Sequence, residues 1–121
     1  MPKVDFIMHQ GVRILVLDVS HTKNIDENIA AFNAGRELAM KEPLKSVRLL
    51  TDVTQAHYTA EGVDVMKEFS KATTPYIKSS AVLGVSGIKR IIVQSIIKLT
   101  GRHIEIFGDR EKALDWLAGQ L

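Results

Sequence analysis

The chain has 121 residues, 45% of them hydrophobic, and contains no cysteine. This length and composition predict one globular domain, residues 1–121, with a core of its own. The missing thiols exclude disulfides, cysteine metal sites and cysteine nucleophiles. No apolar run is long enough to span a bilayer, and the opening MPKVDF lacks the apolar segment of a signal peptide, so we expect a cytoplasmic protein.

The net charge of +2 is unevenly distributed, because no acidic residue lies between Glu68 and Glu105. A basic interval of this kind indicates an anionic partner, or else a solvated face balanced by acidic helices nearby. We do not expect nucleic acid as the partner, because Tyr76 is the only aromatic residue of the basic interval, from Lys71 to His103, and no nucleic-acid-binding signature is present. The basic residues of the interval are Lys71, Lys78, Lys89, Arg90, Lys98, Arg102 and His103.

The first half of the chain predicts two antiparallel strands, a helix and a third strand. Residues 3–8 alternate in polarity, as in an edge strand with one buried face. Residues 13–19, RILVLDV, are apolar on both faces in the middle, and the short turn before them predicts a hairpin. Asn24 caps a helix that runs to about residue 41, and residues 46–54 form a second interior strand.

The second half predicts alternating helices and strands. In order, these are a helix capped by Thr59, a strand over 81–85, a helix over 88–99, a strand over 103–107 and a helix capped by Asp109. Together the elements read β-β-α-β-α-β-α-β-α with short connections. This order predicts an α/β domain with a five-stranded, mixed but mostly parallel sheet and flanking helices.

Four segments carry a resemblance to a known group of proteins: LLTDVT, PYIKSSAVLGVSGIKR, GRHIEIF and EKALDWL. They resemble small, largely uncharacterised bacterial proteins whose fold is similar to the anti-sigma factor antagonist (STAS, or SpoIIAA-like) domain. The resemblance covers the chain from about Val12 onward and implies the same fold. In STAS antagonists this fold binds a partner protein, and a serine in the loop after the third strand is the phosphorylation switch. The corresponding loop here, residues 55–62, lacks that serine, and Thr59 in it is the helix cap.

The residues from Ser86 to Arg90 predict a site for an anion. A strand, a tight glycine turn at Gly87 and a helix N-terminus together present free backbone N–H groups, and Lys89 and Arg90 add positive charge. Cations in the first turn oppose the helix dipole, which indicates that something compensates for them. The alternative is that Ser86 caps the helix, Gly87 permits close packing, and both cations reach into water.

The helix over 88–99 also predicts an interface. One apolar face carries five residues and is expected to be the core face, whereas Val93 and Ile97 point away from it, between basic residues. Such a patch indicates a second copy of the chain or a protein partner, unless a flanking helix covers it; we do not expect a membrane surface. The residues of the expected core face are Ile88, Ile91, Ile92, Ile96 and Leu99.

Polar residues that follow the strands give only weak support for a catalytic or metal site. Asp18, His21, Asp52 and His57 all come just after predicted strands, but no spacing of ligands on one element supports a metal ion or an acid and base pair. A hydrolytic triad of Ser86, His57 and Asp52 has no better support. We therefore expect no catalytic residue, no metal and no cofactor.

Two functions follow from these patterns. The first is a non-enzymatic regulatory domain that binds a protein partner or itself, with contacts from His57, Tyr58, Thr59, Val93 and Ile97. The second is a binder of a small anionic or amphipathic, lipid-like ligand, with the head group at residues 86–90 and an apolar tail between helix and sheet. A hydrolase is the weakest alternative.

Overall fold

The computed structural model describes residues 2–121 and confirms the expected α/β class with its five-stranded mixed sheet. The sheet has the order β1-β2-β3-β4-β5, in which only β1 is antiparallel to its neighbour. The strands are β1 Lys3–His9, β2 Val12–Asp18, β3 Val47–Asp52, β4 Ile77–Leu83 and β5 Glu105–Phe107. The helices are α1 Ile25–Met40, α2 Ala60–Thr73, α3 Ile88–Thr100 and α4 Arg110–Ala118, with a short 3-10 helix, η1, at Thr74–Tyr76.

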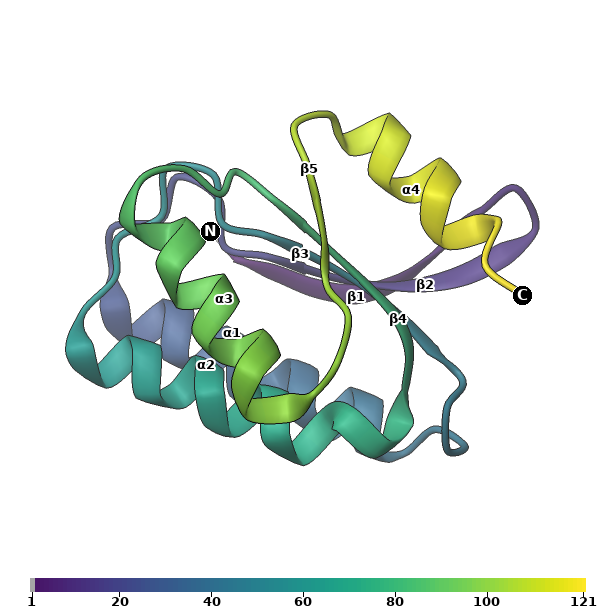
Figure 1. Ribbon diagram of the computed structural model, residues 1–121, viewed down its shortest axis with the longest axis horizontal. Coiled ribbons are helices and arrows are strands. Elements are labelled where there is room, and N and C mark those ends of the chain that lie inside the picture. Colours follow the sequence, from purple (N-terminus) through teal and green to yellow (C-terminus); the bar gives the residue numbers. More distant parts are fainter. Residues whose placement is uncertain (1) are drawn as a thin grey trace.

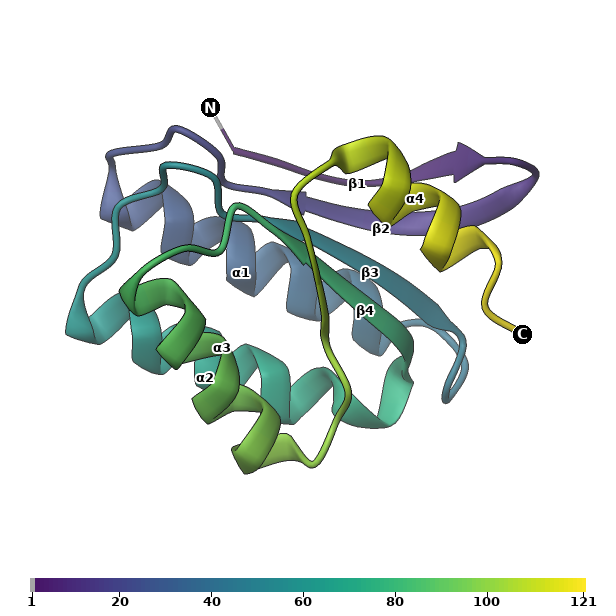
Figure 2. The ribbon, with the colours of Figure 1, turned by 45° about the horizontal axis from the view of Figure 1, so that its top comes forward.

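The helices divide unevenly between the two faces of the sheet. Figures 1 and 2 show α1, α2 and α3 on one face and α4 alone on the other. Central strand β2 contributes to the core on both faces of the sheet, because its side chains alternate. Leu15 and Leu17 face α1, whereas Ile14 and Val16 face α4. This is why the predicted strand over 13–19 is apolar on both of its faces.

Predicted caps start three of the four helices. The side chains of Asn24, Thr59 and Asp109 each accept a hydrogen bond from a backbone N–H in the first turn of their helix. The alternative in which Ser86 caps its helix is wrong: the N-cap residue of α3 is Gly87, which has a positive φ of 57°, and no side chain among residues 2–121 caps this helix. The first turn of α3 is instead closed by the backbone, because the N–H groups of Lys89 and Arg90 donate to the carbonyls of Ser86 and Gly87, at 3.2 Å each.

The expected orientation of α3 is wrong in part, because Ile96 is buried as predicted but Ile91 and Leu99 of the expected core face are exposed. Val93 is only 8% exposed and Ile97 packs on the same cluster, so the two residues predicted to point outward belong to the core. Ile91 is instead 62% exposed and Ile88 52% exposed. The helix is apolar on more than one side, and periodicity alone does not tell which of those sides the sheet covers.

Two strands differ from their predicted bounds. β4 begins at Ile77, before the predicted start at Ala81, because its pairing with β3 continues through the polar residues Lys78, Ser79 and Ser80. Backbone pairing in a parallel sheet does not depend on apolar side chains, so an apolar run marks only part of such a strand. β5 is shorter than expected, with three residues.

Candidate functional site

The carboxylates at the ends of the strands are used within the local structure. Asp52, 8% exposed, accepts hydrogen bonds from the backbone N–H and the hydroxyl of Thr54, at 3.0 and 2.7 Å. Asp18 accepts from the backbone N–H of Ser20 at 2.9 Å and pairs with Arg110 at 3.5 Å. These groups hold the turns after β2 and β3, which is a structural role.

The two cations of the predicted anion site have different surroundings. Lys89 is half-buried and its Nζ donates a hydrogen bond to the carbonyl of Val53, 2.7 Å away, whereas Arg90 is exposed. Desolvation lowers the pKa of Lys89, and the negative charge of Asp52 acts in the opposite direction. The cation that opposes the helix dipole is therefore stabilised by the end of β3. Ser86 and Gly87 are exposed beside it.

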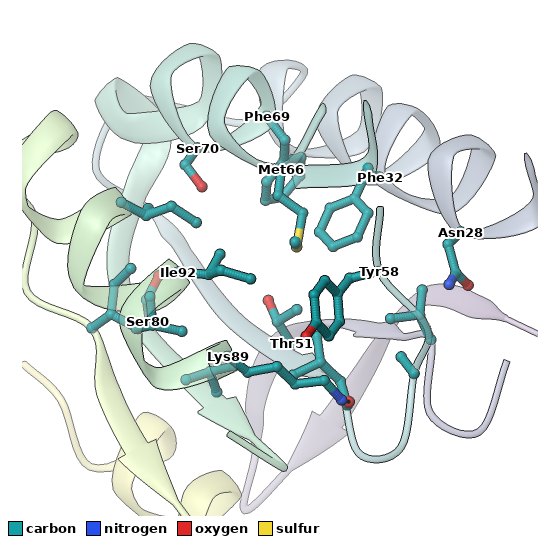
Figure 3. A pocket seen from close by; sticks show the side chains of 18 of the residues that line it. Asn28, Phe32, Thr51, Tyr58, Met66, Phe69, Ser70, Ser80, Lys89 and Ile92 are labelled. Atoms are coloured by element: carbon teal, nitrogen blue, oxygen red, sulfur yellow. Dashed lines mark hydrogen bonds between the residues drawn. The ribbon is translucent and has the colours of Figure 1, made fainter. Parts of the chain in front are cut away.

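A cavity of about 100 Å³ lies between the sheet and helices α1, α2 and α3. Figure 3 shows its walls, with Phe32 from α1, Met66 from α2, Ile92 from α3 and Thr51 from the sheet around one space. Most of the lining is apolar, as is typical of pockets for small molecules. The cavity exists because three helices cover this face without filling the space between them and the strands. Further apolar residues of the lining are Leu49, Val53, Phe69, Val82, Val93 and Ile96.

Polar atoms without partners also lie in this apolar wall. Asn28 is 7% exposed and Ser80 is 3% exposed, and within residues 2–121 neither Asn28 Oδ1 nor Ser80 Oγ has a hydrogen-bond partner. Both residues line the cavity, as Figure 3 shows. A buried polar atom left unpaired costs about 1 to 3 kcal/mol, so groups of this kind point to an occupant that supplies the missing bonds.

Arg102 is a second cation of the cavity wall, and sequence reasoning did not single it out. Its Nε and Nη1 atoms are buried and have no partner in the described part of the chain. Desolvation lowers the pKa of Arg102 to about 10. The basic interval contained the signal, because Arg102 directly follows the glycine that ends α3, but the direction of its side chain depends on the packing.

The residues expected to form a partner interface after β3 lie at the mouth of the cavity. His57 and Tyr58 are exposed and belong to the lining, and the backbone N–H of His57 donates to Thr22 at 3.1 Å. Thr59 caps α2 through the N–H of Gly62, at 3.0 Å. This loop therefore borders the space into which Lys89 extends, as Figure 3 shows for Tyr58 and Lys89.

Comparisons with known proteins support the fold through structure alone. No protein-family model and no curated protein matches the sequence. A solved structure from Shewanella loihica PV-4, described as an uncharacterized protein from the DUF3478 family with a SpoIIAA-like fold, superposes with a TM-score of 0.72. The chain has a SpoIIAA-like fold. The match covers 96% of this chain and 93% of the other at 14% identity, so it concerns the fold and not the activity.

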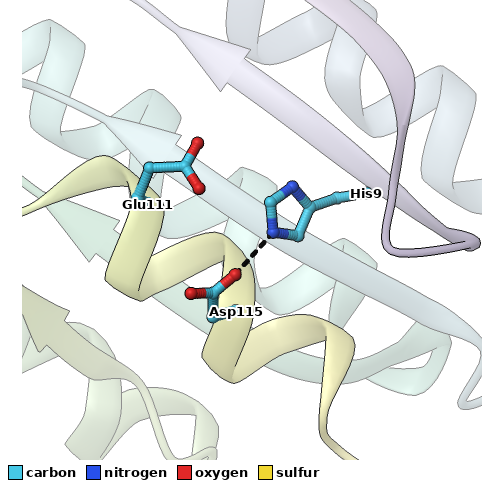
Figure 4. A group of neighbouring side chains, drawn as sticks. All are labelled: His9, Glu111 and Asp115. Atoms are coloured by element: carbon cyan, nitrogen blue, oxygen red, sulfur yellow. Dashed lines mark hydrogen bonds and ion pairs between the residues drawn. The ribbon is translucent and has the colours of Figure 1, made fainter.

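This SpoIIAA-like domain carries one further group of polar side chains, on the face with α4. Nε2 of His9 lies 2.7 Å from Oδ1 of Asp115, which also accepts from Gln10 at 2.8 Å, and Glu111 lies beside them (Figure 4). Both carboxylates are exposed. The contacts tie the tip of the β1–β2 hairpin to α4, which explains the cluster structurally.

None of the helices in residues 2–121 has the length and apolarity that crossing a bilayer requires.

Proposed function

We propose that this protein is a non-enzymatic binding domain whose cavity takes a small, mostly apolar molecule with an anionic group. One observation supports this above all: an apolar cavity whose wall contains unpaired, buried polar atoms and two cations, Lys89 and Arg102. A binding site for an amphipathic molecule combines these two properties. The location in the cytoplasm stays a prediction.

The volume limits the size of the ligand. A cavity of about 150 Å³ holds benzene, and this cavity, at about 100 Å³, is smaller. It therefore suits a short alkyl chain whose polar end reaches the wall, or a single ring that extends toward the exposed lining residues His57 and Tyr58. A long-chain lipid would need an outward movement of the helices. The lipid-like ligand expected from the sequence is therefore replaced, in this proposal, by a smaller molecule.

Titration with benzoate and benzyl alcohol, followed in amide NMR spectra, tests the proposal. We expect saturable shifts for residues of β3, β4 and α3 that line the cavity. Ile92→Trp fills the space and should abolish these shifts, whereas the matched control Ile91→Trp adds the same ring to an exposed position outside the lining and should leave them unchanged. If neither probe shifts cavity residues, the proposed function is wrong.

A second candidate function is contact with a protein partner or with a second copy of the chain. The exposed apolar residues of α3 favour it: Ile88, Ile91 and Leu99 are 52%, 62% and 48% exposed. Val93 and Ile97 no longer support it, because they pack against the sheet. Native mass spectrometry of the wild type and of Ile91→Glu provides the test. A dimer that Ile91→Glu dissociates supports self-association, whereas a wild-type monomer at high concentration contradicts it.

A further inference from the structure

The two cations of the cavity lie at opposite ends of it. Lys89 is bonded to the carbonyl of Val53, whose N–H donates to Leu83 at the end of β4. Ser80 lies earlier in the same strand, about 10 Å from Leu83 at the usual rise of a strand. β5 runs parallel to β4, and Glu105 pairs with Ala81. The residues that precede Glu105, Arg102 among them, therefore lie beside the first half of β4. This is the end of the cavity that holds Ser80.

The two ends differ in their unmet hydrogen bonds. The ammonium of Lys89 already has a partner, the carbonyl of Val53, and the carboxylate of Asp52 contributes negative charge nearby. At the other end, two nitrogens of Arg102 and the hydroxyl of Ser80 are without partners in residues 2–121. An anionic group would therefore gain most at the Arg102 end, where its oxygens would meet donors that are already buried.

The geometry points to a carboxylate, held between the guanidinium of Arg102 and the hydroxyl of Ser80, as the anionic group of the ligand. The ligand class is then a small monocarboxylic acid with an aryl or short alkyl body along Leu49, Phe69 and Ile96. This inference rests on the proposed function and moves the head group away from residues 86–90, where the sequence placed it.

Charge and shape select a carboxylate over other groups. Arg102 presents a planar set of N–H donors that matches the two oxygens of a carboxylate, and one guanidinium neutralises one negative charge. A phosphate monoester carries more charge than this end balances. Even with its pKa lowered to about 10, Arg102 keeps its positive charge at neutral pH.

Affinity measurements with matched probes test the inference. Benzoate should bind the wild type about tenfold or more tightly than benzyl alcohol, because only benzoate brings a charge to Arg102. Arg102→Gln should remove this difference and leave the affinity for benzyl alcohol unchanged. Arg90→Gln, which removes an exposed cation of α3 outside the lining, is the control and should change neither affinity.

A serine pair provides a second, independent comparison. Ser80→Ala should weaken benzoate about fivefold, the effect of one lost hydrogen bond. Ser79→Ala removes a neighbouring buried hydroxyl that is also unpaired within the described residues but does not line the cavity, and it should have no effect. If Arg102→Gln fails to fold, this pair and the benzoate to benzyl alcohol ratio of the wild type decide the question.

The outcomes separate this inference from the proposed function. If benzoate and benzyl alcohol both bind at the cavity residues with equal affinity, the carboxylate assignment is wrong, whereas the proposed function as a binding domain stands. Tighter binding of phenyl phosphate than of benzoate, or a loss of benzoate binding in Lys89→Gln with none in Arg102→Gln, would likewise overturn the carboxylate assignment. Absence of binding by every probe would overturn both.

Discussion

The two faces of the sheet differ in how closely their helices pack against the strands. On one face, α4 alone covers the central strands, and its residues Ala113 and Leu117 are both 0% exposed. On the other face, α1, α2 and α3 leave a cavity of about 100 Å³ with unpaired polar atoms in its wall. A single short helix can settle directly onto the strands, whereas three helices that also pack on one another cannot all do so. The larger layer is therefore where binding is expected.

Leu117→Ala should show the tight packing of the α4 face most clearly. We expect a loss of about 4 kcal/mol in the free energy of unfolding, because the side chain is fully buried and its removal leaves a void. The corresponding change on the other face, Ile92→Ala, should cost less than half as much, because Ile92 is half-buried and borders existing space. Urea unfolding measures both. Leu44→Ala, at a position 68% exposed, is the control.

Gly84→Ala should disturb the edge of the sheet where the turn after β4 lies against the turn after β3. Gly84 has a positive φ of 78°, and an added Cβ would lie 2.3 Å from Cα of Thr54. We expect a loss of about 3 kcal/mol from backbone strain and overlap together. Gly108→Ala, where the added Cβ meets nothing within 4 Å and φ is not positive, should change the unfolding free energy by less than about 0.5 kcal/mol. Equal effects of the two substitutions would contradict this account.

Arg102→Met should stabilise the protein without ligand. The substitution replaces a desolvated cation, whose Nε and Nη1 find no partner in residues 2–121, by an apolar side chain of similar length, and we expect a gain of about 1 kcal/mol. Thermal melts should show the rise. Arg90→Met, at an exposed position, should leave the melting temperature unchanged. A loss of stability in Arg102→Met would mean that the guanidinium is a structural group.

Thr59→Ala should have a small effect that is confined to the layer with the cavity. The lost cap of α2 costs about 1 kcal/mol. We expect faster amide hydrogen exchange in the first turns of α2 and unchanged exchange in α4. Asp109→Ala, which removes the cap of α4, is the reciprocal variant and should speed exchange in α4 alone. Uniformly faster exchange in either variant would show that the two layers unfold as one unit.

Much of the fold could be predicted from the sequence because its signals are local. The edge strand at 3–8, the apolar run at 13–19 and the cap residues Asn24, Thr59 and Asp109 depend on signals within a few residues of chain, and the structure confirms these elements and caps. The same is true of the fold class, since alternating strands and helices with short connections admit few arrangements. The single buried face expected of 3–8 is wrong, because Met8 is 67% exposed and Ile7 packs on the core beneath α4.

The candidate site could be predicted only in part, because its signals are not local. Lys89 was identified, and so was the space between helix and sheet, but Asn28, Ser80 and Arg102 were not. Each of these residues is unremarkable in its own segment, and it becomes a candidate because a distant element covers it. Burial and missing partners are properties of the assembled layers, so no local pattern reports them.

The sequence by itself determined which segments become strands and helices, where most helices begin, and that the chain forms an α/β domain. Only the tertiary structure decided the strand order, the division of helices between the faces, and which side of α3 meets the sheet. The physical reason is that propensity, capping and periodicity act along the chain, whereas the burial of Val93, the exposure of Ile91 and the unpaired groups of Arg102 depend on contacts between elements far apart in it.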